Sequence, residues 1–255
     1  MRQTIIQELD KIEKRYAVKI ILASESGSRA WGFPSSDSDY DVRFIYVNRP
    51  EWYMTIGNKK DVIELPVDEV LDINGWDLKK ALQLMKKSNV PLMEWLSSPI
   101  QYRTLPHLLQ YLTALSQRAF MPETACHHYL SMARKYAKAL DNDKNAKLKT
   151  IMYAVRALLC CEWIIRHRSH PPMHISDVFA GIEVASMFKD EVNTLIGIKK
   201  KHPETYKAAR PEAIERYISE KIAMLPEKIP KNPERPSLDV FDDVFLTIVT
   251  ESISS

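Results

Sequence analysis

Two short runs rich in β-branched and aromatic residues lie close together near the start of the chain. The first run, VKIILAS (18–24), is typical of a buried strand. The second run, DYDVRFIYV (39–47), alternates polar and apolar residues before it becomes apolar, which predicts a strand whose first side chains point to opposite faces of a sheet. The segment 24–38 between them holds two of the 6 glycines of the whole chain, with a proline and several serines, and indicates tight turns. This order of strand, turn and strand requires a sheet in the N-terminal part.

Helices are expected on both sides of this pair. Apolar residues at helical spacing predict helices over 2–15, 76–87 and 91–96. The segment 61–73 indicates two short strands that are split at Pro66.

Strand signals almost vanish after about residue 104. Apolar residues then recur at helical spacing over 105–120, 122–140, 147–167, 175–188 and 204–225. The proline-rich segment 226–237 indicates a surface linker, and 238–253 is helical or strand-like. We therefore predict a domain of strands and helices over 1–104, followed by a helical domain over 105–255.

The chemistry of the chain is concentrated in Gly27-Ser28, which is followed after ten residues by Asp39-Tyr-Asp41. Glycine allows a tight turn and a close approach of the backbone to a phosphate. Backbone N–H groups at the start of a short helix over 28–32, with the Ser28 hydroxyl, would hold phosphate oxygens of a nucleotide. Asp39 and Asp41 lie two residues apart on a strand and are expected on the same face.

Two neighbouring carboxylates repel each other unless a cation lies between them. Their hard oxygens suit Mg²⁺, with Mn²⁺ as a substitute, and two such ions about 3.5–4 Å apart can bind the attacking and leaving oxygens of a phosphoryl displacement. Arg43 follows Asp41 by two residues, so it is a candidate to pair with a carboxylate or a phosphate on that face. In the alternative interpretation, the serines and Asp37 of the segment only cap turns.

The stretch ASESGSRAWGFPSSDSDYDVRFIYV resembles the glycine-serine and paired-aspartate motif of the DNA polymerase β nucleotidyltransferase superfamily. More narrowly, the chain resembles the predicted nucleotidyltransferase family linked to RNA repair that is called RlaP. This closer resemblance depends on NGWDLKKALQLMKKSN (74–89), PLMEWLSSPIQY (91–102) and KTIMYAVRALLCCEWI (149–164). It extends to about residue 175.

The resemblance implies an α+β fold, in which a small mixed sheet with flanking helices is followed by an all-helical accessory domain. The superfamily uses a third carboxylate on a neighbouring strand, flanked by apolar residues. Leu71-Asp72-Ile73 fits this position best because it lies just before the helix 76–87, and Ile63-Glu64-Leu65 is the second candidate. This carboxylate would hold the catalytic metal with Asp39 and Asp41, or help to deprotonate the attacking hydroxyl.

Four basic residues are further candidates for contacts with the nucleotide: Arg29, Lys80, Lys149 and Arg156. Arg29 flanks the Gly-Ser turn, and Lys80 lies in the family-like helix. Lys149 and Arg156 share one face of a predicted helix with Tyr153. For each of them a solvent-exposed structural side chain is the alternative.

The charge of the chain is unevenly distributed. Residues 1–104 hold 15 Lys/Arg and 15 Asp/Glu, whereas residues 118–170 hold 10 Lys/Arg and 4 Asp/Glu, a net charge of +6. Such a region can attract a polyanion, although solvated helix faces would give the same composition.

The location of the protein is predicted from three absences in the sequence. The 3 cysteines are odd in number and poorly spaced for a disulfide framework, the N-terminus has no apolar signal-peptide core, and no apolar run approaches the roughly 20 residues of a membrane span. We expect a cytoplasmic protein that does not enter a membrane.

The predicted reaction is an attack by a hydroxyl on the α-phosphorus of an NTP, with release of pyrophosphate. The resemblance implies an RNA 3′ end as the acceptor, such as tRNA or a damaged RNA end, bound through the basic region 118–170. The alternatives are the adenylylation of a protein, as in antitoxin-like nucleotidyltransferases, and a non-catalytic nucleotide-binding protein. The intact Gly27-Ser28, Asp39 and Asp41 argue against the last of these.

Overall fold

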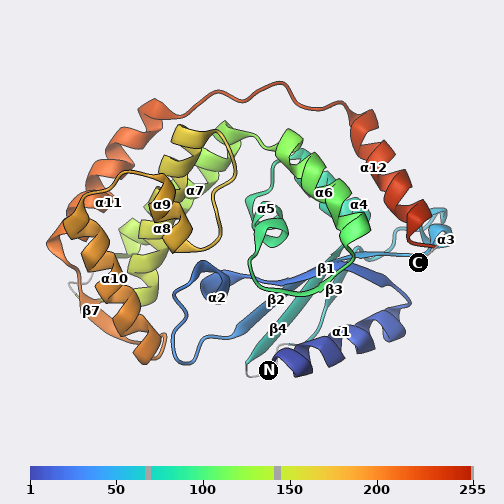
Figure 1. The fold of residues 1–255 in the computed structure, drawn as a ribbon, viewed down its shortest axis with the longest axis horizontal. Coiled ribbons are helices and arrows are strands. Elements are labelled where there is room, and N and C mark those ends of the chain that lie inside the picture. The colour runs from blue at the N-terminus through green and yellow to red at the C-terminus, as the bar shows by residue number, and fades with distance from the viewer. Residues whose placement is uncertain (67–69, 141–144, 254–255) are drawn as a thin grey trace. The chain divides into compact units, whose positions relative to one another are not determined.

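The computed structural model describes residues 1–66, 70–140 and 145–253. The chain forms two compact units (Figure 1). Unit 1 consists of Met1–Gly27, Asp39–Phe120 and Glu234–Ser255, and unit 2 of Ser28–Ser38 and Met121–Pro233.

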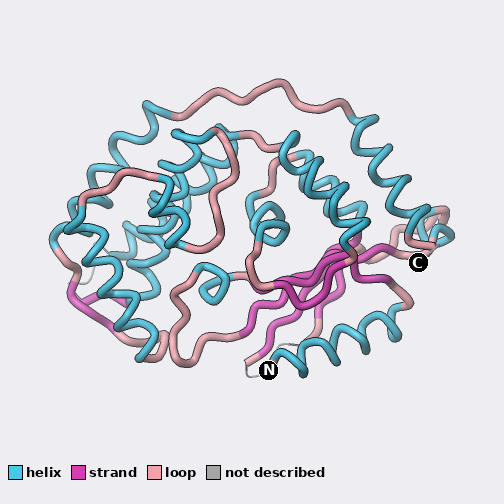
Figure 2. The backbone as a smooth tube through the Cα atoms, in the orientation of Figure 1, coloured by secondary structure: helices cyan, strands magenta, loops and turns pink. Residues whose placement is uncertain are grey.

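Unit 1 is built on a five-stranded sheet with the strand order β3-β4-β2-β1-β5. The strands are β1 (Lys19–Glu25), β2 (Tyr40–Val47), β3 (Val62–Glu64), β4 (Leu71–Asp77) and β5 (Gln101–Thr104), drawn in magenta in Figure 2. β2 and β4 are parallel, whereas the other neighbouring strands are antiparallel. The predicted α+β fold with a small mixed sheet is therefore confirmed. Strand β5 is not foreseen because its four residues, QYRT, are too short and polar to show an alternation.

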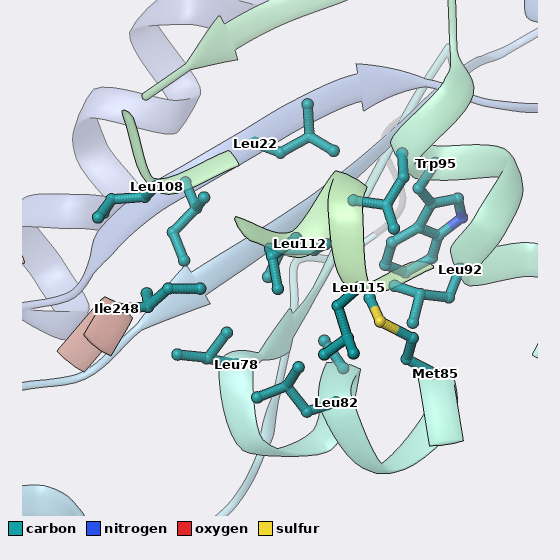
Figure 3. Packing of buried hydrophobic residues seen from close by; sticks show 14 of the residues in the cluster. Leu22, Leu78, Leu82, Met85, Leu92, Trp95, Leu108, Leu112, Leu115 and Ile248 are labelled. Atoms are coloured by element: carbon teal, nitrogen blue, oxygen red, sulfur yellow. The ribbon is translucent and has the colours of Figure 1, made fainter. Parts of the chain in front are cut away.

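Helices cover both faces of this sheet. On one face, α1 (Arg2–Tyr16) buries Ile5, Leu9 and Ile12 in a cluster with Val42 and Phe44 of β2. The other face packs against α4 (Leu78–Lys86), α5 (Val90–Ser97), α6 (Pro106–Ala119) and α12 (Leu238–Glu251), whose apolar side chains form the cluster of Figure 3. The short helix α3 (Pro50–Tyr53) follows β2.

The alternation along β2 determines which face receives its polar side chains. Val42 and Phe44 belong to the cluster of α1, whereas Ile45 belongs to the cluster of α4, α5, α6 and α12. Because side chains two residues apart share a face, Asp41 and Arg43 lie on the same face as Ile45. On this face of β2, the polar residues Asp41 and Arg43 come first and the apolar Ile45, which is part of the hydrophobic core, comes after them.

Unit 2 is mainly helical. Its helices are α7 (Pro122–Leu140), α8 (Leu148–His167), α9 (Ile175–Gly181), α10 (Ser186–Lys201) and α11 (Glu212–Met224), which is followed by the 3₁₀ turn η1 (Leu225–Lys228). Two strands of three residues, β6 (Asn145–Lys147) and β7 (Lys207–Ala209), form a small antiparallel pair within the region that was predicted to be entirely helical. Segments this short carry no period that a sequence pattern could detect.

The predicted boundary at residue 104 and the two compact units differ in two places. Helices α6 and α12 belong to unit 1, because Leu108 and Leu112 of α6 and Ile248 of α12 lie in the same cluster as Leu82 of α4. Residues 28–38 belong to unit 2. Helical periodicity shows that a segment has an apolar face, but it does not show which core that face joins.

None of the described helices is both long enough and apolar enough to span a membrane. The longest described helix, α8, has 20 residues and is interrupted by Arg156 and Glu162.

Candidate active site

Two carboxylates lie side by side at the start of the two parallel strands. Asp41 of β2 is the register partner of Asp72 of β4, so the two side chains share a face of the sheet. The Arg43 guanidinium bridges them, since its Nη2 lies 3.0 Å from Asp41 Oδ1 and 2.7 Å from Asp72 Oδ2. Arg43 Nη1 also donates to the backbone oxygen of Asp72, at 3.0 Å. The pairing of Arg43 with a carboxylate, one of its two predicted roles, is confirmed.

The bridge has an electrostatic cause. Two adjacent carboxylates repel each other, and an interposed cation offsets this repulsion. The side chains of Asp41 and Asp72 are each 32% exposed, whereas that of Arg43 is 18% exposed. The carboxylates therefore remain open to solvent while the arginine lies against the sheet.

Gly27 approaches this carboxylate pair with its backbone. Its φ is +60°, and a Cβ atom at this position would lie 2.3 Å from Asp41 Oδ2. The preceding residue, Ser26, donates its backbone N–H to the backbone carbonyl oxygen of Asp41 at 2.8 Å. A side chain at position 27 would be strained by the backbone angle and would also displace the carboxylate. The short helix predicted over 28–32 is present as α2 (Gly27–Trp31), which starts one residue earlier, at this glycine.

A buried glutamate supports the backbone of Asp41. Glu25 is fully buried, and its Oε1 accepts the N–H of Asp41 at 2.9 Å, while its Oε2 accepts the Tyr102 hydroxyl. Burial and the bond to Glu25 both raise the pKa of the Tyr102 phenol, so that it remains a donor. Glu25 is not part of the glycine-serine and aspartate pattern that predicts the site. The available signal was a charged residue at the end of an apolar strand, directly before the turn.

Within unit 2, hydrogen bonds close the loop that contains Ser28. Ser28 as a whole residue is 5% exposed, and its hydroxyl lies 3.2 Å from the Ser38 hydroxyl. Arg29 donates from Nη2 to the backbone oxygen of Ser38 at 2.6 Å. Both predicted phosphate-binding side chains are thus engaged with the far end of their own loop, and their contact with a nucleotide stays a prediction.

Glu204, for which no role was predicted, forms hydrogen bonds between this loop and the segment after α10. Its Oε1 lies 3.2 Å from the Ser38 hydroxyl, and its backbone N–H donates to Asp37 at 2.8 Å. Lys149 forms an ion pair with Glu204 at 2.7 Å, and the buried Lys199 donates to the Ser35 hydroxyl at 2.7 Å. Lys149 therefore meets the loop of Ser28 through a glutamate, a role that spacing along α8 could not indicate.

Arg156 is buried in unit 2, in contrast to an exposed phosphate-binding side chain. It is 2% exposed, and its guanidinium lies 4.2 Å from the centre of the Trp31 ring. Its Nη2 lies 3.5 Å from the backbone oxygen of Met173. The edge of Tyr153 packs against the same Trp31 ring. This environment favours a packing role for Arg156 over the predicted nucleotide contact.

Lys80 lies far along the sheet from the carboxylate pair. It forms an ion pair with Asp61 at 3.0 Å, and the backbone of Asp61 accepts the N–H of Asp77 at the end of β4. Asp72 is five residues earlier on this strand, which corresponds to about 16 Å. The structure does not bring Lys80 to Asp72, so its predicted nucleotide contact gains no support.

The two candidates for the third carboxylate occupy different positions. Asp72 is the register partner of Asp41. Glu64 lies on the edge strand β3, pairs with Asn74 of β4 and accepts a hydrogen bond from the side-chain amide of Asn74 at 3.3 Å. The geometry favours Asp72 because only this carboxylate shares a cation with Asp41.

This chain is similar to a described protein family and to two known proteins. The family described as "RlaP: RNA repair pathway DNA polymerase beta family" matches residues 1–247. The chain belongs to the RlaP family. An uncharacterised protein of Bacillus subtilis (strain 168), YcgL, is 45% identical to this RlaP-family chain over 227 residues, which cover 89% of the chain and 87% of YcgL. A solved structure of a nucleotidyltransferase-like protein from Exiguobacterium sibiricum 255-15 matches with a TM-score of 0.30 and 12% identity, over 88% of this chain and 74% of that protein.

Membership of the polymerase β-like RlaP family implies divalent metal ions in general. Among the described residues, no three His, Cys, Asp or Glu side chains converge closely enough to bind an ion. Asp39 is exposed and lies directly before β2, which begins at Tyr40, so it is not on the strand as predicted. Asp41 and Asp72 nevertheless converge on one cation, Arg43, with solvent-accessible hard oxygens. These two carboxylates fit Mg²⁺ or Mn²⁺, which Asp41 and Asp72 would hold.

Arg43 should compete with a metal ion for the two carboxylates of this RlaP-family site. We expect Arg43→Met to lower the unfolding free energy in EDTA by about 1 kcal/mol, since it leaves the partly exposed carboxylates facing each other without a cation. The same variant should bind Mn²⁺ about 10-fold more tightly, because a cation a few ångströms away repels the ion by about 1 kcal/mol or more. Calorimetric unfolding with and without Mn²⁺, and Mn²⁺ binding followed by electron paramagnetic resonance, measure the two effects.

Arg49→Met provides the control for this experiment. Arg49 is exposed and lies two residues after the end of β2. Its replacement by methionine removes the same charge. It should change neither the Mn²⁺ affinity nor the gain in stability on adding Mn²⁺. Equal Mn²⁺ affinity in the Arg43→Met variant and the unsubstituted protein would contradict the competition.

Proposed function

We propose that this protein is a metal-dependent nucleotidyltransferase that transfers NMP from an NTP to the 3′ hydroxyl of an RNA and releases pyrophosphate. The observation that carries the proposal is the pair Asp41 and Asp72, in register on parallel strands beside the backbone of Gly27. Two adjacent carboxylates on rigid strands suit the binding of divalent ions at a fixed position.

In the proposed reaction, the RNA 3′ oxygen forms a bond with the α-phosphorus, and the bond from this phosphorus to the oxygen of the β-phosphate breaks. Asp41 and Asp72, with Asp39, would hold the ions, and Asp72 would also accept the proton of the attacking hydroxyl. When bound, the ions would neutralise the charge that develops on the attacking and leaving oxygens. Glu25 keeps the backbone of Asp41 in place.

The RNA acceptor is supported by two observations. The family description names an RNA repair pathway. The region 118–170 has a net charge of +6, although its residues 141–144 lie outside the described part of the chain. A basic region favours a polyanionic acceptor over a protein hydroxyl, because backbone phosphates supply a large part of nucleic-acid affinity.

A labelling experiment tests this function. The protein is incubated with Mg²⁺ or Mn²⁺, each of the four NTPs labelled on the α-phosphate, and a mixture of tRNA and lysate protein. The expected result is labelled RNA with one preferred nucleotide, and periodate oxidation of the RNA 3′ end should abolish the label. A labelled protein band without labelled RNA would show that the acceptor is a protein. Binding of NTP without any labelled product would show that the protein binds nucleotides but does not transfer them.

A further inference from the structure

Unit 2 contains a cavity that the proposed chemistry does not use. It has a volume of about 720 Å³ and lies between α7 and α11. The volume is within the range of ligand sites, roughly 300–1,000 Å³. It is lined by Arg134, Ala137, Lys138, Leu140, Arg210, Glu212, Glu215, Arg216, Ile218, Ser219 and Ile222.

The wall of this cavity carries a surplus of positive charge. Four basic side chains line it, namely Arg134, Lys138, Arg210 and Arg216, against the two carboxylates of Glu212 and Glu215. Arg210 pairs with Glu215 at 2.9 Å, whereas the described residues place no carboxylate within 4 Å of the other three basic side chains. Among the described lining residues, three cations therefore face a single unneutralised carboxylate, an arrangement that favours an anionic occupant.

Arg210 shows that one part of this wall lacks an acceptor. Its side chain is 18% exposed, and its Nε is buried without a hydrogen-bond partner among the described residues. A buried guanidinium N–H without an acceptor is costly, so a ligand oxygen at this position would remove a penalty. Arginine is also the side chain best suited to the geometry of a phosphate.

Apart from the charged residues and Ser219, the lining is apolar. Ala137 and Leu140 come from α7, and Ile218 and Ile222 come from α11. A free phosphate would leave these side chains without a contact, whereas a nucleotide places its base on an apolar surface and its phosphate on cations. Arg134 and Lys138 are one helical turn apart, so they can contact consecutive phosphates along a strand.

We infer that the cavity between α7 and α11 binds single-stranded RNA, with phosphates on Arg134, Lys138, Arg210 and Arg216 and a base on the apolar side chains. The inference rests on the proposed function for the choice of RNA as the polyanion. It goes beyond that function by assigning a binding site to named residues of unit 2. The site holds the acceptor strand and takes no part in the bond changes.

The test is a binding measurement on the full-length chain, in EDTA and without NTP, so that it does not depend on catalysis. The fluorescence anisotropy of a labelled single-stranded 15-nucleotide RNA is measured over a range of salt concentrations. We expect Arg134→Glu/Lys138→Glu to weaken binding at least about 10-fold, and to reduce the slope of log affinity against log salt by about 1.4, for two lost contacts to a single strand.

Lys86→Glu/Lys87→Glu is the matched control. Both lysines are exposed at the end of α4 in unit 1, and the double substitution changes the net charge by the same amount. It should alter RNA affinity less than about 3-fold, since it acts only through the overall field. Arg134→Gln/Lys138→Gln, which removes the charges without reversing them, repeats the test with a milder change, and circular dichroism confirms that each variant is folded.

Three results would overturn the inference. The first is unchanged RNA affinity in both cavity variants, and the second is an equal loss in the control. The third is displacement of the bound RNA by AMP or inorganic phosphate at a concentration that does not change the ionic strength, because the cavity would then be a small-anion site. RNA binding that depends on Arg134 and Lys138 without any nucleotide transfer would support the site and contradict the proposed function, so the two failures are distinguishable.

Discussion

Replacement of Asp41 by asparagine is expected to lower kcat/KM for nucleotide transfer at least about 1,000-fold, which corresponds to roughly 4 kcal/mol of transition-state stabilisation. Asparagine retains the shape of the side chain and one oxygen, but it removes the charge that would hold a divalent ion. The side chain is 32% exposed and pairs with Arg43, so the fold should survive. Steady-state transfer of labelled NMP measures the loss of kcat/KM, and calorimetric unfolding of the same sample shows whether the fold survives.

The neighbouring carboxylates supply the controls for this prediction. Asp72→Asn should cause a loss of similar size because Asp72 is the register partner of Asp41. Glu64→Gln removes a charge from the edge strand and should change kcat/KM less than about 3-fold, as is usual for a surface residue away from the reacting atoms. Transfer above a tenth of the normal rate in the Asp41→Asn variant would refute the site.

Replacement of Gly27 by alanine should disable the same site without removing any charged group. The backbone angle of +60° disfavours alanine, and its Cβ would lie 2.3 Å from Asp41 Oδ2. We expect the unfolding free energy to fall by roughly 1–3 kcal/mol, the usual cost of such strain. Displacement of the Asp41 carboxylate by about 1 Å should lower the transfer rate about 100-fold.

Gly57→Ala is the matched control for the glycine substitution. Gly57 lies in unit 1, its φ is not positive, and nothing lies within 4 Å of a Cβ atom built there. This variant should retain both stability and transfer. If Gly27→Ala and Gly57→Ala behaved alike, the close approach of Gly27 to Asp41 would have no functional meaning.

The sheet and the position of Asp41 could be predicted because local patterns specify them. The alternation in 39–47 places Asp41 and Arg43 on one face, but it also assigned Asp39 to the strand, which begins one residue later. Asp72 was expected only because the family resemblance implies a third carboxylate flanked by apolar residues. The parallel register that sets Asp72 opposite Asp41 lies beyond such patterns, because the pairing of strands depends on contacts between residues far apart in the chain.

The remaining contacts of the candidate site could not be read from spacing. Glu25 meets the backbone of Asp41 from the neighbouring antiparallel strand, and Glu204 reaches Ser38 across a sequence separation of 166 residues. Lys80 and Arg156 have the right chemistry for phosphate binding, yet the fold pairs one with Asp61 and stacks the other on Trp31. Residue type alone does not decide between these uses.

The return of the last helix to the first core affects how the protein can be synthesised. Helix α12 contributes Phe241, Ile248 and Val249 to the cluster that also contains Leu112 of α6. Residues 1–237 therefore leave the ribosome before α12 can cover this surface. Until then the nascent chain exposes apolar side chains that belong to this cluster, and transiently exposed apolar surface favours aggregation.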